Sequence, residues 1–471
     1  MKKITFFIVF AILAIAPFFG YAQSKNDYSK FNGAWQGIVV AEGDSQMVVI
    51  DITGDSTLKI KAGLPWIAMV DKVASKPIYQ NDTLSFKVSE LQFTFKGRVD
   101  FDKKSISGLC KIGKSYPLTL LYTDKPTRVN RPQKPKEPYP YSSEEVQFTN
   151  KKQNVSLGGT LTLPKGEGPF PAVVLITGSG AQNRDEELLG HKPFLVIADY
   201  LTRNGIAVLR YDDRGVGKST GKFSEATTLD FATDAEAAFE FLIKDKRINA
   251  GKTGLMGHSE GGVIAPIVAS RNKKVKFVVL LAGTGVDGKA LMLEQYRLIL
   301  KASSIPDSII GPLVDLNRQA FDVAMTIPDN AKAGVKIREI TDSTIQKLGE
   351  ETSKKYNLSK RTAEQLIMQV LTPWMKEFIR LNPADYLCKV NCPILALNGE
   401  SDLQVPAAQN IPAIQKAVAK NKKGKLSVMT FPKLNHLFQT ANTGSPSEYA
   451  RIEETFNEDV LKEILKFITG L

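Results

Sequence analysis

The chain has few of the residues that form disulfide frameworks or bind metal ions. Only three cysteines and three histidines occur among its 471 residues. Three cysteines are too few, and odd in number, for a disulfide framework. The histidines and cysteines show no zinc-site spacing, and neither a complete phosphate-binding loop nor a dinucleotide-binding fingerprint is present. The sequence therefore predicts no metal ion and no cofactor.

Cys388 and Cys392 are the two cysteines that lie close together in the sequence. A disulfide bond is one interpretation of this spacing. The simpler one is that two small apolar side chains flank the start of a strand.

Long apolar runs are also missing after the amino terminus. The chain begins with Met1 and two lysines, Lys2 and Lys3. The apolar run that follows, residues 4–19, is shorter than the roughly 20 residues of a membrane-spanning helix. Small side chains at residues 20–22 are typical of a cleavage site, so we expect the mature chain to begin at Gln23. We interpret residues 1–22 as a signal peptide, which predicts a periplasmic or secreted protein with no stable membrane anchor. An uncleaved anchor is the alternative.

The formal net charge of +13 raises the question of an acidic partner such as nucleic acid. The lysines are scattered, however, and the one dense run, at residues 416–425, ends a predicted helix, where cations suit the helix dipole. No interleaved aromatic residues accompany that run. We interpret the charge as a contribution to solubility, and we expect no nucleic-acid partner.

One pentapeptide carries the main chemical signal. Gly257-His258-Ser259-Glu260-Gly261 reads G-x-S-x-G and directly follows the strand-like residues 253–256. A strand, a sharp turn and a helix in this order predict a nucleophile elbow, in which the strained turn needs glycines beside the serine. We therefore predict Ser259 as a nucleophile.

A serine hydrolase with such an elbow needs an acid and then a histidine further along the chain. His191 precedes the serine and His258 lies inside the elbow, so we predict His436 as the general base. The acid should follow the apolar run that begins at Cys392. We favour Asp402, because a short side chain beyond the turn suits an orienting role; Glu400 is the alternative.

Several ordered motifs extend this pattern: LITGSGAQNRDEE (175–187), GHKPFLVIAD (190–199), YDDRGVGKS (211–219), GHSEGG (257–262), NGESDLQV (398–405) and LNH (434–436). Together they resemble secreted bacterial serine hydrolases of the α/β-hydrolase superfamily, in its serine-aminopeptidase-like and acyl-esterase branch. The resemblance covers about residues 145–471. It implies carboxylic-ester chemistry on a small-molecule ester or peptide and leaves the substrate open, because the branch includes esterases, lipases and peptidases.

An oxyanion hole made of backbone N–H groups is expected beside such a nucleophile. The first predicted donor is Glu260, the residue after the serine. The second comes from the glycine-rich turn at residues 177–180, where we choose Ser179 and then Gly180. The family often has histidine where Thr177 stands, so this turn departs from the family pattern.

Charged residues follow two of the predicted strands, at residues 184–186 and 212–214. A clamp for a charged substrate group is one interpretation. We favour the other, that these side chains pair with one another and hold their loops. His191 and His258 are assigned to packing and loop support.

The chain divides into regions of different composition. Residues 28–123 contain short segments separated by turns, which predict a small antiparallel β domain, a barrel or a sandwich. Its strands are expected at residues 35–40, 46–52, 56–60, 83–88, 91–96 and 116–122. Residues 124–142 hold several prolines and predict a stiff linker. Residues 143–471 are predicted to form the hydrolase domain, with a helical cap inserted at about residues 288–382.

Buried strands and amphipathic helices alternate in the hydrolase region. The strands are expected at residues 171–177, 206–211, 253–256, 276–282, from 393 and at 426–431, and the helices at 194–204, 230–244 and 448–468. This order predicts a doubly wound, mostly parallel α/β-hydrolase sheet with a helical cap insertion, preceded by a small all-β domain.

These observations predict a secreted serine hydrolase that cleaves carboxylic esters through an acyl-enzyme on Ser259. A serine peptidase with the same triad is one alternative. A non-catalytic binding protein on a hydrolase scaffold is another.

Overall fold

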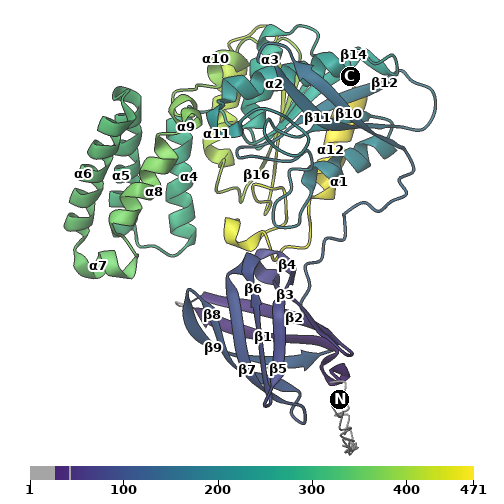
Figure 1. Cartoon of the computed structure of the whole chain (residues 1–471). Coiled ribbons are helices and arrows are strands. Elements are labelled where there is room, and N and C mark those ends of the chain that lie inside the picture. Colours follow the sequence, from purple (N-terminus) through teal and green to yellow (C-terminus); the bar gives the residue numbers. More distant parts are fainter. Residues whose placement is uncertain (1–26, 42–43) are drawn as a thin grey trace, which may run out of the picture. The chain divides into compact units, whose positions relative to one another are not determined.

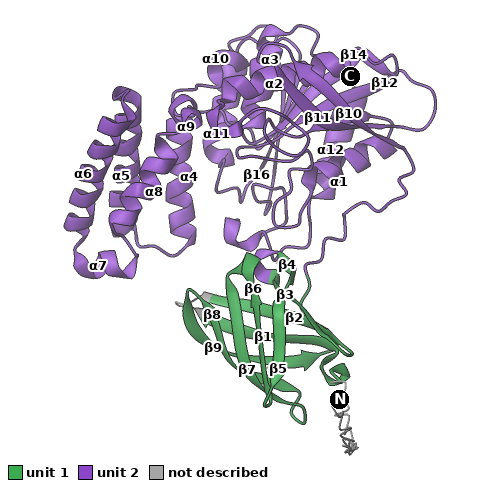
Figure 2. Cartoon of the chain, viewed as in Figure 1, with its two compact units in different colours: residues 1–65, 69–128 green, residues 66–68, 129–471 purple. Residues whose placement is uncertain are grey.

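The computed structural model describes residues 27–41 and 44–471 of the chain. The predicted signal peptide lies outside the described residues. The chain divides into two compact units (Figure 2): residues 1–65 and 69–128 belong to unit 1, and residues 66–68 and 129–471 belong to unit 2. No helix of the described residues is long and apolar enough to cross a bilayer.

Unit 1 is built on one antiparallel sheet of nine strands, in the order β4-β3-β2-β1-β9-β8-β7-β6-β5 (Figure 1). The strands are β1 Gly33–Ala41, β2 Asp44–Gly54, β3 Leu58–Leu64, β4 Met69–Val73, β5 Ser75–Gln80, β6 Thr83–Val88, β7 Phe93–Asp100, β8 Ser105–Ile112 and β9 Lys114–Thr123. The edge strands β4 and β5 are consecutive in the chain, and Ala74 N donates to Ile60 O of β3 at 2.9 Å. The sheet therefore curls around a core that includes Trp35, Phe93 and Phe95.

Three strands of unit 1 are missing from the sequence expectation: β4, β5 and β8. Strands β4 and β5 have half-exposed or exposed side chains on both faces. They therefore lack the alternation of apolar and polar residues that is typical of a strand with one buried face. Leu91, expected in a strand, lies instead in the short 3-10 helix Ser89–Leu91, and the strand starts at Phe93.

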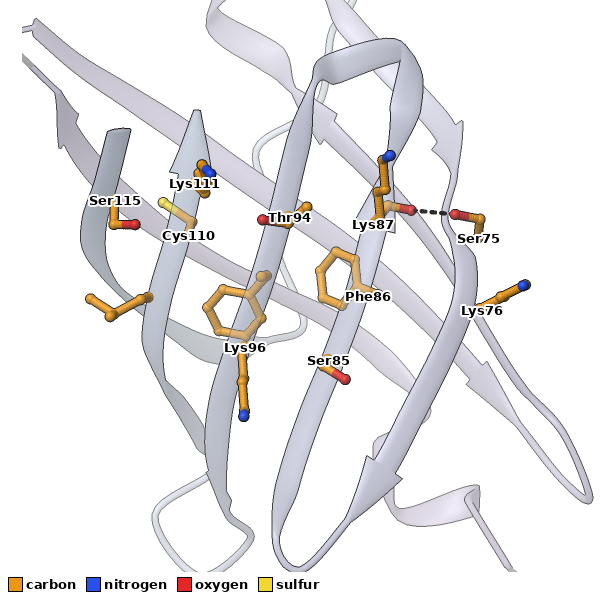
Figure 3. A pocket seen from close by; sticks show the side chains of 12 residues that line it. Ser75, Lys76, Ser85, Phe86, Lys87, Thr94, Lys96, Cys110, Lys111 and Ser115 are labelled. Atoms are coloured by element: carbon orange, nitrogen blue, oxygen red, sulfur yellow. Dashed lines mark hydrogen bonds between the residues drawn. The ribbon is translucent and has the colours of Figure 1, made fainter. Parts of the chain in front are cut away.

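A pocket of about 470 Å³ lies on strands β5 to β9 (Figure 3). Its lining includes Lys76, Lys87, Lys96 and Lys111 together with hydroxyl-bearing side chains such as Thr94. The pocket is lined by residues of unit 1 alone.

Unit 2 contains an eight-stranded sheet in the order β10-β11-β13-β12-β14-β15-β16-β17. Its strands are β10 Ser142–Asn150, β11 Val155–Leu163, β12 Phe170–Ile176, β13 Ala207–Tyr211, β14 Ile248–His258, β15 Val278–Leu281, β16 Pro393–Gly399 and β17 Lys425–Phe431. Strands β12 to β17 run parallel, whereas β11 pairs antiparallel with both β10 and β13. The antiparallel hairpin β10–β11 is absent from the sequence expectation.

Helices cover both faces of this sheet (Figure 1). One face packs against α1 Pro193–Arg203 and α12 Glu458–Thr469, and the other against α2 Thr228–Leu242, α3 Gly261–Arg271, α10 Ala384–Leu387 and α11 Ala407–Val418. The two buried faces explain why central strands such as β12 are apolar at nearly every position. The fold is that of an α/β hydrolase.

The chain between β15 and α10 is a helical insertion. It comprises α4 Gly288–Ala302, α5 Asp307–Thr326, α6 Asn330–Leu348, α7 Glu350–Lys355, α8 Lys360–Val370 and α9 Pro373–Phe378. Its helices share a core of their own, which includes Leu316, Phe321 and Val370. The two ends of the insertion meet, because Gly288 N donates to Leu381 O at 3.1 Å.

Two details differ from the sequence expectation. The closing helix begins at Glu458 rather than at residue 448, because Asn457 Oδ1 caps it by accepting from Asp459 N at 3.0 Å. The residues just before it form the 3-10 helix Pro446–Glu448 and a loop. All three cysteines are free, so Cys388 and Cys392 form no disulfide bond.

Candidate active site

Ser259 lies in a sharp turn between β14 and α3. Its φ of +53° is in the left-handed region, which a residue with a side chain occupies at a cost. A Cβ atom on Gly257 would lie 1.9 Å from Gly261 O, and one on Gly261 would lie 2.2 Å from Ile176 O. Only glycine fits on either side, which explains the G-x-S-x-G spacing.

Three parallel strands bring the predicted residues to one edge of the sheet. Ser259 follows β14, Asp402 follows β16 and His436 follows β17. Strands β14, β15, β16 and β17 are successive neighbours, so their carboxyl ends lie along the same edge. The His436 ring packs against that of His258, with 4.7 Å between ring centroids, which places it beside the elbow.

Asp402 and His436 are in direct contact. The His436 Nδ1 atom lies 2.8 Å from Asp402 Oδ2, and both side chains are buried. The other oxygen, Oδ1, accepts from the backbone N–H groups of Gln404 and Val405, each at 2.8 Å. Because Asp402 holds Nδ1, the Nε2 atom of His436 is the nitrogen left without a partner in the described part of the chain.

Glu400, the alternative acid, faces elsewhere. It is exposed, and its Oε1 atom accepts from Thr430 Oγ1 at 3.0 Å. It makes no contact with His436 among the described residues. The turn after Gly399 therefore directs the carboxylates of Glu400 and Asp402 to different surroundings, although they are only two positions apart.

The glycine-rich turn after β12 lies against Ser259. A Cβ atom on Gly178 would be 3.2 Å from Ser259 Cβ. The N–H of Gly178 donates to Glu186 Oε1 at 2.7 Å, whereas those of Ser179, Gly180 and Glu260 have no acceptor within the described chain. Thr177 Oγ1 donates to Asp213 Oδ1 at 2.7 Å.

His258 joins two of the loops at the site. Its Nδ1 atom lies 2.9 Å from Glu186 Oε1, and its Nε2 atom lies 2.9 Å from His436 O. Burial alone would lower the pKa of His258, but the charge and hydrogen bond of Glu186 outweigh it and raise the pKa above 6.5. The expectation that His258 serves packing and loop support agrees with these contacts, whereas its partner Glu186, 72 positions away, could not be predicted from the sequence.

The side chain of Glu260 is also buried. Its Oε1 atom accepts from Thr228 Oγ1 at 2.6 Å and from Trp374 Nε1 at 2.7 Å. Burial raises the pKa of this carboxyl to about 7, against the hydrogen bonds, which lower it. Trp374 belongs to α9, so this contact ties the helical insertion to the elbow.

The charged residues after β12 and β13 pair mostly outside their own group. Arg184 does bind Asp212, with its Nη2 atom 2.7 Å from Oδ2. The other partners lie elsewhere: Asp185 pairs with Lys192 and Arg210, Glu186 with His258, Asp213 with Thr177 and Gln182, and Arg214 with Asp234. The expectation that they pair with one another is therefore correct only for Arg184 and Asp212. Each of the other four residues binds a side chain or backbone group outside this set, which could not be predicted from its position in the sequence.

His191 is fully buried and far along the chain from its partners. Its ring nitrogens lie 3.0 Å from Thr455 Oγ1 and 2.9 Å from Tyr449 O. Burial lowers its pKa to about 4. Among the described residues, no group of three or more histidine, cysteine, aspartate or glutamate side chains is arranged to hold a metal ion.

The sheet order, the strained serine and the acid–histidine contact define the class: this is a hydrolase of the α/β-hydrolase fold. Residues 192–439 match the family model described as serine aminopeptidase, S33. The match covers more than half of the chain, which therefore belongs to this family.

Similar proteins include esterase EstD from Thermotoga maritima, 26% identical over 381 residues that cover 80% of this chain and 78% of that protein. A shorter match, 30% identical over 128 residues, is to human mitochondrial acyl-coenzyme A thioesterase 2 and covers 27% of this chain and 23% of that one. Among solved structures, the Pyrococcus furiosus esterase Pf2001 aligns with 74% of this chain and 98% of its own at 15% identity, with a TM-score of 0.42.

Proposed function

We propose that this protein hydrolyses carboxylic esters through an acyl-enzyme on Ser259. The observation that carries the proposal is the contact between His436 Nδ1 and Asp402 Oδ2, at the same sheet edge as a serine held at positive φ. Esterase EstD, similar over most of both chains, supports ester chemistry. The substrate is a small-molecule ester, and the reaction needs no cofactor.

Each residue has a defined role in the proposed reaction. His436 Nε2 takes the proton from the Ser259 hydroxyl while Oγ attacks the carbonyl carbon of the ester. His436 then gives the proton to the departing alcohol, and a water molecule releases the acid by the reverse sequence. Asp402 orients the imidazole and stabilises its charged form.

The oxyanion is stabilised by backbone N–H groups. We assign these donors to Glu260 and Ser179, with Gly180 as the neighbouring choice, because their N–H groups have no acceptor within the described chain. The N–H of Gly178 is excluded from this role because it already binds Glu186. Loss of one such donor costs about 3 kcal/mol of transition-state stabilisation.

Replacement of the nucleophile tests the proposal. Ser259→Ala should reduce ester hydrolysis to background and abolish labelling by a fluorophosphonate probe, while the thermal midpoint stays close to that of the wild type. Ser270→Ala, in the helix that follows the elbow, is the matched control and should keep full activity and labelling. Labelling of another serine in the Ser259→Ala protein would contradict the assignment.

A peptidase is the second candidate, and the family model favours it. The same serine, histidine and aspartate would then attack an amide. Parallel assays on an aryl ester and an aminoacyl arylamide separate the two activities. A protein that neither hydrolyses these substrates nor reacts with the probe would be a binding protein on a hydrolase scaffold.

We also propose that the protein is exported. The support is the pattern of residues 1–22, in which two lysines precede an apolar run that ends in the small residues Gly20 and Ala22. Amino-terminal sequencing of the protein from a producing cell should then start at Gln23.

A further inference from the structure

One buried side chain contacts both the turn beside Ser259 and the elbow that carries it. Glu186 is 5% exposed, and its Oε1 atom accepts from Gly178 N at 2.7 Å and lies 2.9 Å from His258 Nδ1. Gly178 immediately precedes Ser179, the proposed oxyanion donor. Glu186 itself is held at a φ of +51°, a strained conformation that its surroundings must maintain.

The opposite side of the His258 ring reaches the loop of the general base. Its Nε2 atom lies 2.9 Å from His436 O. A carbonyl oxygen only accepts hydrogen bonds, so Nε2 must carry a proton. An ionised carboxylate also only accepts, so Nδ1 opposite an ionised Glu186 carries one too. The two contacts together fit a doubly protonated His258 paired with an ionised Glu186, whereas a neutral pair would need the Glu186 carboxyl to donate its own proton to Nδ1.

We propose that Glu186 and His258 form a buried ion pair that positions the oxyanion turn and the general-base loop against the nucleophile elbow. The inference rests on the proposed function, because the positioned groups are its oxyanion donor and its base. The contacts run from Gly178 through Glu186 and His258 to the backbone of His436. They link the loops after β12, β14 and β17.

Both members are positioning residues and not catalytic residues. Their side chains are buried, and they bind Gly178 N, each other and His436 O. A shift of about 1 Å in a positioned group is enough to slow a reaction about 100-fold. Loss of the pair should therefore lower kcat much more than it raises KM.

The charged state of the pair is measured first. The chain has only three histidines, so a protein labelled with ¹⁵N in histidine gives a simple spectrum. At pH 7 we expect both ring nitrogens of His258 to be protonated, and a His258→Gln variant identifies its signals. The titratable groups that face this ring are Glu186, Asp402 and His436. A singly protonated His258 in the wild-type protein would overturn the ion pair.

Two substitutions separate charge from geometry. Glu186→Ala removes both contacts and should lower kcat on an aryl ester about 10- to 100-fold, with KM changed less than about threefold. Glu186→Gln removes the negative charge and keeps an amide oxygen that can accept from both Gly178 N and a protonated His258 Nδ1, because both groups contact the same atom, Oε1. A neutral His258 protonated at Nδ1 loses its hydrogen bond to His436 O, so this variant should lose less of kcat than Glu186→Ala while His258 becomes singly protonated. It also serves as the test if the alanine variant does not fold.

Asp234→Asn is the matched control, because it disrupts another buried ion pair in unit 2. Arg214 Nε lies 2.7 Å from Asp234 Oδ2, and neither residue contacts the site. This variant should lower the thermal midpoint and keep kcat. An equal loss of kcat in Asp234→Asn and Glu186→Ala, or an unchanged kcat in Glu186→Ala, would overturn the positioning role.

Failure of the proposed function gives a different result. A wild-type protein that hydrolyses no ester would refute the proposed reaction, and the positioning role with it. The ¹⁵N signals of His258 would still decide whether the ion pair exists.

Discussion

The carboxylate of Asp402 illustrates how a single residue is fixed for one task. Two backbone N–H groups hold one oxygen, so the other is directed at His436 Nδ1. Glu400 lies two positions earlier and binds Thr430 at the surface instead. A carboxylate that is hydrogen-bonded on both oxygens is already oriented for the imidazolium that forms during the reaction.

We expect Asp402→Asn to lower kcat on an aryl ester by about 10⁴-fold, because an amide no longer favours the required imidazole tautomer. Glu400→Gln is the matched control and should change kcat less than about twofold. Steady-state kinetics of both purified variants measure the difference. Comparable losses in the two variants would show that Asp402 is not the orienting acid.

Glu260 links protonation to stability at the residue scale. Burial raises its pKa from 4.5 to about 7, so the folded protein binds this proton more tightly than the unfolded chain does. The resulting stabilisation is fully present below pH 4.5 and is lost as the pH rises through 7. Glu260→Gln should therefore reduce the loss of stability between pH 5 and pH 8, by roughly 3 kcal/mol.

Denaturant unfolding at several pH values measures this effect. Part of the pH dependence should remain in the variant, because burial also raises the pKa of Asp213, to about 8. Glu225→Gln changes an exposed carboxyl and should leave the wild-type profile intact. A Glu260→Gln profile identical to the wild type would contradict the prediction.

At the scale of elements, α9 connects the helical insertion to the elbow. Trp374 donates to Glu260, and its ring stacks on Phe378 with 5.0 Å between centroids. The other helices of the insertion pack mainly against one another. A change at Trp374 therefore acts on the attachment of the insertion and leaves the helices themselves intact.

Trp374→Phe keeps the stacked ring and removes the hydrogen bond to Glu260. If the insertion sets access for the acyl chain, kcat/KM for long-chain esters should fall about tenfold relative to the shortest ester. Met368→Ala, at an exposed position of α8, is the control and should leave the chain-length preference unchanged. A uniform loss on all esters, with the fold retained, would show that the insertion does not set chain-length specificity.

The elements that the sequence predicted well are those with an unambiguous pattern. The central strands β12 and β13 lie within one residue of their expected bounds, since a strand buried on both faces is apolar throughout. The hairpin β10–β11 was missed because its edge strand β10 is largely exposed and carries glutamates. The start of α12 was misplaced because its cap, Asn457, looks like any loop residue.

Over the whole molecule, the order of motifs along the chain led to Ser259, Asp402 and His436, because a fixed order of residues can be read from a sequence. The contacts between Glu186 and His258, and between Glu260 and Trp374, join residues 72 and 114 positions apart. Such pairs depend on which loops the sheet brings together. A single sequence does not show which loops lie next to one another in the folded protein.

Each unit also has a hydrophobic core of its own. The core of unit 1 lies inside its curled sheet, and the cores of unit 2 lie on the two faces of its eight-stranded sheet and within the helical insertion. No residue belongs to the core of both units. Stability in each unit is therefore supplied by its own strands and helices.

The meeting of Gly288 with Leu381 has a consequence for how such a protein changes over generations. The chain leaves the sheet after β15, builds a helical body with an interior of its own, and returns to the point of departure before β16. Such an excursion behaves as an exchangeable cassette. Helices α4 to α8 can lengthen, shrink or be replaced by recombination without altering the strand order, as long as α9 keeps its contact with Glu260. If the insertion sets access for the acyl chain, such changes would open new substrate ranges while the reacting groups are inherited unchanged.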